Sequence, residues 1–204
     1  MNNSPPPQAA AAADRISVAM ESALNSLRPS ELEIIHFPDP RLRTPARAVS
    51  DFGPALASLV ARMFECMRAA RGVGRAAPQL GVGLRVFVIN VTGDPANDLV
   101  FVNPQLHDLS GTLAASEGCL SIPEVHVEVR RAARCRAAAH DLGGRAFEIE
   151  GEGLLARAMQ HELDHLNGVL IVDRMGPSDR IATRRTLREL EDAFARLRPA
   201  ARSR

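Results

Sequence analysis

Residues 160–168 read "QHELDHLNG" and place two histidines, His161 and His165, four positions apart. The surrounding pattern predicts a helix over residues 154–167. Residues four apart lie on one face of a helix, so both imidazoles can reach a single divalent metal ion. Glu162 directly follows the first histidine and stands close enough to hold a water on that ion. The stretch therefore predicts a metal-binding helix, and a catalytic metal would need a third protein ligand from elsewhere in the chain.

Composition narrows the kind of protein to which this helix belongs. The 204 residues are 46% hydrophobic and 24% charged, which is enough for one globular core, and no apolar run is long enough to span a membrane. The formal net charge of +1 gives no basis for direct nucleic-acid or membrane binding. The three cysteines include no CxxC pair, so we expect a reducing cytoplasm, with Cys66 and Cys135 as buried structural residues.

The chain divides into three parts by composition and periodicity. Residues 1–30, rich in proline and alanine, predict a disordered N-terminal extension. Residues 31–176 predict the folded catalytic domain, which includes an N-terminal helix over residues 54–72 with apolar side chains at three- and four-residue steps. Residues 177–204 predict a C-terminal amphipathic helix and tail.

The middle of the chain has the pattern of a sheet. Short segments rich in Val, Ile and Phe are separated by turn residues and predict antiparallel strands over residues 85–91, 99–103, 125–129 and 145–150. The segment "VLIVDR", residues 169–174, predicts a further strand. The order helix, strands, helix, strand, helix favours an α+β fold over a doubly wound sheet.

The third metal ligand separates the classes of metal hydrolase. A metzincin protease would need histidine where this chain has Ile171, so that class is excluded. A thermolysin-like site would use Glu189 or Glu191, but both lie in the arginine-rich C-terminal helix. "EGCLSIP", residues 117–123, offers Cys119, whose thiolate could complete a Cys-His-His site.

A third stretch, "GVGRAAPQLG" at residues 72–81, contains Gln79. Its neutral amide can donate a hydrogen bond to an oxyanion, or it can satisfy the backbone of its own loop.

The three stretches together resemble one family, the peptide deformylases, which combine GxGxAAxQ, EGCLS and QHExDHLxG segments in this order. The resemblance covers residues 32–175. It implies an α+β fold in which antiparallel strands surround a central metal-binding helix, with an N-terminal and a C-terminal helix. It also implies that Cys119, His161 and His165 bind one divalent ion, expected to be Fe²⁺, with Zn²⁺, Ni²⁺ or Co²⁺ as alternatives.

The reaction that this resemblance implies is removal of the formyl group from the N-terminal methionine of newly synthesised proteins, releasing formate. Hydroxide formed on the metal would attack the formyl carbon, with Glu162 as general base and then general acid. The Gln79 amide and the backbone N–H of Leu120 would stabilise the negative charge on the formyl oxygen. The partners are then N-formylmethionyl nascent peptides, with a transient contact to the ribosome.

The resemblance also implies where the substrate lies. The peptide backbone would add as an extended strand, and the methionine side chain would enter an apolar pocket beside His161. The substrate-binding residues expected from this arrangement are Val73, Gly74, Glu117, Gly118, Leu154 and Ala158. Arg75 and Arg157 lie within these segments, and we expect both as solvated arginines at the rim.

Two other classes of function remain as alternatives. A metallopeptidase would cleave an internal peptide bond, and a non-enzymatic metal-binding protein would hold an ion without turnover. The residues after HExxH argue against the first, and Gln79 together with Glu162 argues against a closed structural site.

Overall fold

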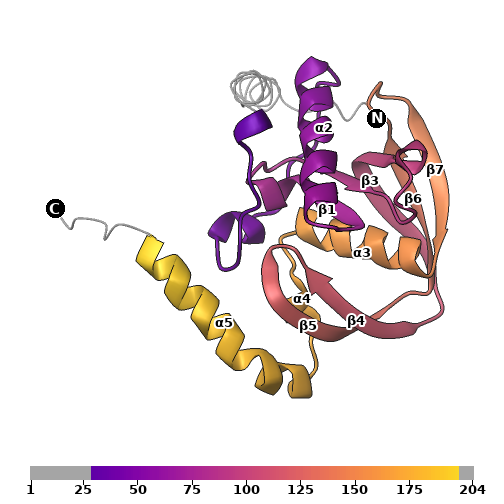
Figure 1. The fold of residues 1–204 in the computed structure, drawn as a ribbon. Coiled ribbons are helices and arrows are strands. Elements are labelled where there is room, and N and C mark those ends of the chain that lie inside the picture. Colours follow the sequence, from indigo (N-terminus) through magenta and orange to yellow (C-terminus); the bar gives the residue numbers. More distant parts are fainter. Residues whose placement is uncertain (1–28, 198–204) are drawn as a thin grey trace, which may run out of the picture.

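The computed structural model describes residues 29–197 (Figure 1). The expected N-terminal extension therefore lies outside the described residues except for its last two positions, and so does the end of the C-terminal tail. Helices and antiparallel strands are both present, and the predicted α+β class is confirmed.

The largest element is a five-stranded antiparallel sheet. Its strands stand in the order β1-β2-β3-β6-β7. They span Gly74–Ala76 (β1), Val86–Ile89 (β2), Leu99–Ser110 (β3), Arg134–His140 (β6) and Ala146–Glu152 (β7). The remaining strands, Leu113–Cys119 (β4) and Ile122–Arg131 (β5), pair with each other as a separate hairpin.

Helix α3, Leu154–Leu166, lies in the middle of the molecule and contacts all five strands of the sheet (Figure 1). Its residues Met159 and Leu166 are fully buried, in a core cluster with Phe87 and Phe101 of the sheet. Burial of several such side chains stabilises this packing by about 2 kcal/mol each. The opposite face of α3 is left to carry the histidines.

Helix α2, Pro54–Ala69, covers β1 and β2 as the predicted N-terminal helix. Proline suits its first turn because the missing N–H has no partner there. Its apolar side chains, among them Leu56, Leu59 and Met63, enter a second core cluster with Val86. Cys66 is buried beside this cluster, as expected.

The segment that follows α3 has a different structure from the predicted one. Residues 169–174 were expected as a strand, but Ile171–Arg174 form the short helix α4. The side chain of Asp173 accepts a hydrogen bond from the backbone N–H of Leu170 at 2.8 Å, which caps a helical turn. Leu170 and Ile171 are buried against β5. The apolar run in this segment therefore indicated correctly that its side chains are buried, but it did not indicate a strand.

Helix α5, Pro177–Leu197, is the predicted C-terminal amphipathic helix. It contacts β5, and its C-terminal end extends away from the rest of the molecule (Figure 1). Leu187 and Leu190 of α5 pack against a third core cluster, which contains the β5 residues Ile122, Val125, Val127 and Val129. Among the helices within residues 29–197, none has both the length and the apolar character needed to cross a membrane.

Four short 3-10 helices complete the described chain. They span Pro29–Glu31 (η1), Pro40–Arg43 (η2), Ala77–Leu80 (η3) and Pro95–Asn97 (η4). Of these, η3 matters most for the site because it carries Gln79.

Candidate active site

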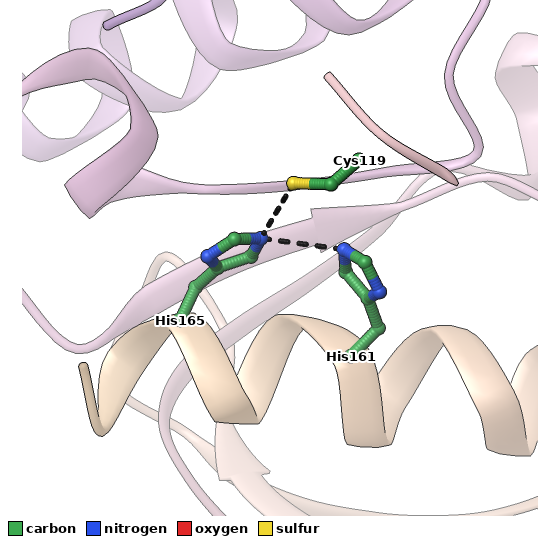
Figure 2. A group of neighbouring side chains, drawn as sticks. All are labelled: Cys119, His161 and His165. Carbon is green, nitrogen blue, oxygen red and sulfur yellow. Dashed lines mark hydrogen bonds between the residues drawn. The ribbon is translucent and has the colours of Figure 1, made fainter. Parts of the chain in front are cut away.

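Three side chains from distant parts of the sequence converge beside α3. Cys119, at the end of β4, meets His161 and His165 of α3, and the three ligand atoms lie within 4.8 Å of one another (Figure 2). Nε2 of His165 lies 3.3 Å from the Cys119 sulfur and 3.3 Å from Nε2 of His161. A sulfur and two imidazole nitrogens are the donor set of Zn²⁺ and related divalent ions, so this group could hold a metal ion.

The orientation of His161 fits that use. Its Nδ1 lies 3.0 Å from a carboxylate oxygen of Glu117. An ionised carboxylate can only accept, so Nδ1 donates to Glu117 while Nε2 faces His165. Burial lowers the pKa of His161, but hydrogen bonds with Cys119 and Glu117 outweigh it and raise this pKa to about 10, so a bound metal ion would take the place of the proton on Nε2. Such a carboxylate partner fixes the ring and raises its basicity as a metal ligand.

Glu117 belongs to a buried network of ion pairs. Arg131 donates to both of its oxygens, at 2.7 and 2.9 Å, and Arg157 donates to one at 2.5 Å. Arg131 also reaches Asp164 at 2.8 Å, and Arg174 binds the same carboxylate. Burial alone would raise the pKa of Glu117, but the hydrogen bonds from His161 and Arg131 outweigh it and lower that pKa to about 2. Glu117 is therefore held ionised behind the histidine.

Glu162 lies on the same helix with one oxygen free. Its Oε2 is buried and has no hydrogen-bond partner among the described residues. Burial raises the pKa of Glu162 to about 7, against the lowering effect of His161 and Arg75. Gly74 is the close neighbour of this carboxylate, and a Cβ at that position would clash with it. A carboxyl group with a pKa near neutrality can both take and return a proton.

Gln79 has its amide fixed in one orientation. Its Oε1 accepts a hydrogen bond from the backbone N–H of Ala76 at 2.9 Å. Its Nε2 therefore points the other way, 3.7 Å from the Cys119 sulfur. The hydrogen bond to the backbone of its own loop is therefore present, and its Nε2 faces the Cys119 sulfur; donation to an oxyanion stays a prediction. Leu120 directly follows Cys119 in the turn between β4 and β5.

A pocket of about 450 Å³ opens over this group. That volume is typical of small-molecule sites. All nine residues expected to bind substrate or to act in catalysis line it: Val73, Gly74, Gln79, Glu117, Gly118, Leu120, Leu154, Ala158 and Glu162. Cys119 and His161 line it as well, and His165 lies deeper, with 1% of its surface exposed.

Comparison with known proteins decides the family. A family model described as Polypeptide deformylase matches residues 31–181. The peptide deformylase of Cellvibrio japonicus is 45% identical over 166 residues, which are 81% of this chain and 98% of that protein. A crystal structure of a peptide deformylase from Legionella pneumophila shares 44% identity with a TM-score of 0.75, covering 82% of this chain and 99% of that one. The peptide deformylase structure from Plasmodium falciparum shares 32% identity with a TM-score of 0.78, covering 84% and 100% of the two chains.

The chain belongs to the peptide deformylase family. This confirms the family, the fold class and the expectation of an enzyme. Within the deformylase fold, the hairpin β4–β5 brings the cysteine and α3 brings the histidines.

Two arginines of this deformylase are not where we expected them. Arg157 was predicted to be solvated at the rim, but it is 7% exposed, because Glu117 and the carbonyls of Leu113 and Val129 bind its guanidinium. Arg75 was also predicted at the rim, and it is fully buried.

The burial of Arg75 follows from its place in β1, a strand that contacts both α2 and α3. Its Nη2 donates to the Cys66 carbonyl at 3.4 Å, and its Nε and Nη1 are buried without a partner among the described residues. Burial lowers the pKa of Arg75, while Glu162, Cys66 and Cys119 raise it.

Arg131 was not predicted as a site residue from the sequence. A signal was present, because inward-facing positions of β5 alternate with exposed ones, and Arg131 continues the buried series of Val125, Val127 and Val129. An arginine in the buried register of a strand needs an acidic partner, and in this deformylase that partner is Glu117.

Proposed function

We propose that this protein removes the formyl group from the N-terminal methionine of newly synthesised proteins, using one divalent metal ion. The observation that carries the proposal is the convergence of Cys119, His161 and His165 with Glu162 in one pocket. Family membership supports it, since the relatives named above are peptide deformylases.

Cys119, His161 and His165 would hold the ion, and Fe²⁺ is the ion that we propose, with Zn²⁺, Ni²⁺ or Co²⁺ able to replace it. A divalent ion bound there would lower the pKa of a water and polarise the formyl oxygen. The donor set supports this, because Glu117 accepts from Nδ1 of His161 and leaves Nε2 as the nitrogen that would coordinate the ion.

Glu162 moves the proton in the proposed reaction. Its unpartnered oxygen takes a proton from the water that attacks the formyl carbon. When the bond between the formyl carbon and nitrogen breaks, Glu162 returns this proton to the nitrogen, leaving formate and a free amino terminus. A pKa near 7 suits both transfers.

Gln79 and Leu120 stabilise the developing charge. The Gln79 amide group, held by its bond to Ala76, donates to the formyl oxygen as that oxygen becomes negative. The backbone N–H of Leu120 is the second proposed donor. A neutral amide does this without adding a charge that would bind the substrate ground state equally well.

The substrate lies between two segments that flank the pocket. Its backbone pairs in an extended form with Val73–Gly74 and Glu117–Gly118, and its first side chain enters between Leu154 and Ala158.

The remaining features of the proposal concern the whole chain. Residues 31–176 form the catalytic domain, followed by the helix and tail of residues 177–204. The protein acts in the cytoplasm, where its free thiols Cys66, Cys119 and Cys135 stay reduced. Its contact with the ribosome, where nascent peptides emerge, is transient.

Hydrolysis of formyl-Met-Ala beside acetyl-Met-Ala tests the proposal. The anaerobically purified protein should release formate and leave the acetyl peptide intact, because a formyl carbon is less hindered. Glu162→Ala should keep its metal and lose kcat by on the order of 10²–10⁴. Cleavage of internal peptide bonds, or metal loss in Glu162→Ala, would contradict the proposed reaction or the proposed role.

A further inference from the structure

Arg157 lies on α3 one turn before His161, on the helix face that forms the pocket. Residues at positions i, i+3, i+4 and i+7 share a face, and here they are Leu154, Arg157, Ala158 and His161. All four line the pocket. The wall that receives the first side chain of the substrate therefore contains an arginine beside Leu154 and Ala158.

The hydrogen bonds of Arg157 leave some of its donors unused. A guanidinium has five N–H groups. Nη1 donates to Glu117 Oε1 at 2.5 Å and to the Val129 carbonyl at 3.0 Å, and Nη2 donates to the Leu113 carbonyl at 2.6 Å. These three bonds hold the guanidinium against both strands of the hairpin. The N–H of Nε and the second N–H of Nη2 have no acceptor among the described residues.

Filling the pocket changes the surroundings of these donors. Arg157 lines the open pocket, and its Nε is not fully buried, so water can accept from the donors that face the pocket. A side chain that enters displaces this water, and a purely apolar one leaves the donors without partners, which costs more than an ordinary hydrogen bond contributes. A side chain with an acceptor at the right depth avoids this cost.

We propose that Arg157 determines the specificity of the pocket, by favouring a first side chain that carries a hydrogen-bond acceptor over an isosteric hydrocarbon. This inference rests on the proposed deformylase function. Methionine and norleucine have nearly the same shape, but the methionine thioether is a weak acceptor where norleucine has a methylene. Methionine sulfoxide carries a much stronger acceptor at the same position.

Three peptides measure this preference: formyl-Met-Ala, formyl-norleucyl-Ala and formyl-Met-Ala oxidised to the sulfoxide. The measurement is the ratio of kcat/KM values within one preparation, so that the active fraction cancels. We expect kcat/KM for methionine relative to norleucine to fall by roughly 2- to 10-fold when Arg157 is replaced, and the relative value for the sulfoxide to fall further.

Arg157→Lys is the sharper variant. A lysine ammonium has three donors, enough for Glu117 and the carbonyls of Leu113 and Val129, and keeps none for the pocket. It should retain the fold and lose the preference. Arg157→Met removes the donors altogether, and its loss of preference should equal or exceed that of lysine.

Arg131→Lys is the matched control. Arg131 binds the same Glu117 carboxylate but does not line the pocket, so its replacement can lower the rate while leaving the ratios unchanged. Unchanged ratios in both Arg157 variants would overturn the inference and leave the deformylase function standing. Equal changes in Arg131→Lys would also overturn it, because the effect would then come from Glu117. Failure of the wild type to hydrolyse any formyl peptide would instead overturn the proposed function, and this inference with it.

Discussion

Replacing Glu117 by glutamine removes a charge from the centre of the buried network while keeping its size. The folded protein lowers the pKa of this group from 4.5 to about 2. A shift of about 2.5 units at about 1.36 kcal/mol per unit corresponds to about 3 kcal/mol of stability at neutral pH. Glu117→Gln should lose an amount of this order, since Arg157 would keep a buried charge without its carboxylate and Arg131 would keep only Asp164 as an anionic partner.

The sign of the pH dependence gives a second test of the same change. A carboxylate whose folded pKa is depressed stabilises the protein above its unfolded pKa and loses this contribution as pH falls. The difference in unfolding free energy between wild type and Glu117→Gln should therefore be largest above pH 4.5 and shrink as the pH falls toward 2.

Urea unfolding of the metal-free proteins measures the stability difference, and competition with a chelator measures metal affinity. In Glu117→Gln, Nδ1 of His161 loses the ionised carboxylate to which it donates. Metal should therefore bind about 10- to 100-fold more weakly. Glu128→Gln, an exposed carboxylate on the neighbouring strand β5, is the control and should change neither quantity. Equal unfolding free energies for wild type and Glu117→Gln at pH 7 would refute the electrostatic reasoning, and equal metal affinities would refute the role of Glu117 in orienting His161.

Three further outcomes follow from the site. Cys119→Ala and His165→Ala should each lose both metal and activity because each removes a ligand, and a variant with full metal content would exclude its residue from the ligand set. Gln79→Leu should lower kcat by on the order of 10²–10³ with unchanged metal content, and an unchanged kcat would reduce Gln79 to its contact with Ala76. The iron-loaded enzyme should lose activity in air faster than a nickel-loaded one, since Fe²⁺ oxidises readily; equal decay with sulfinic acid at Cys119 would assign the loss to the thiolate.

The helices and the Val- and Ile-rich strands could be predicted because each carries its own periodicity. Strands β1, β4 and β6 were missed for a common reason. β4 reads "LAASEGC" and β6 reads "RCRAAAH", both poor in β-branched residues. Their extended form comes from pairing, since β6 lies between β3 and β7 and β4 pairs along β5. A strand whose extended form depends on such pairing cannot be recognised from its own few residues.

The candidate metal ligands could be predicted because each stands in a short motif. The ion pairs around them could not, because their partners are far apart in sequence. Glu117 and Arg157 are 40 positions apart, and Arg131 and Asp164 are 33 apart. The same distance explains the error at Arg157: an arginine beside a pocket looks solvated until the carboxylate that neutralises it is known.

The separation of the ligands along the chain also bears on folding kinetics. Cys119 and His165 are 46 positions apart, with strands β5, β6 and β7 between them. The loop must close, and these strands must pair, before the ligand group exists, so an ion cannot help the chain through its early folding. An ion that binds only the finished arrangement would leave the folding rate unchanged and slow the unfolding rate. Metal loading would then act on the lifetime of the native state more than on the speed with which that state is reached.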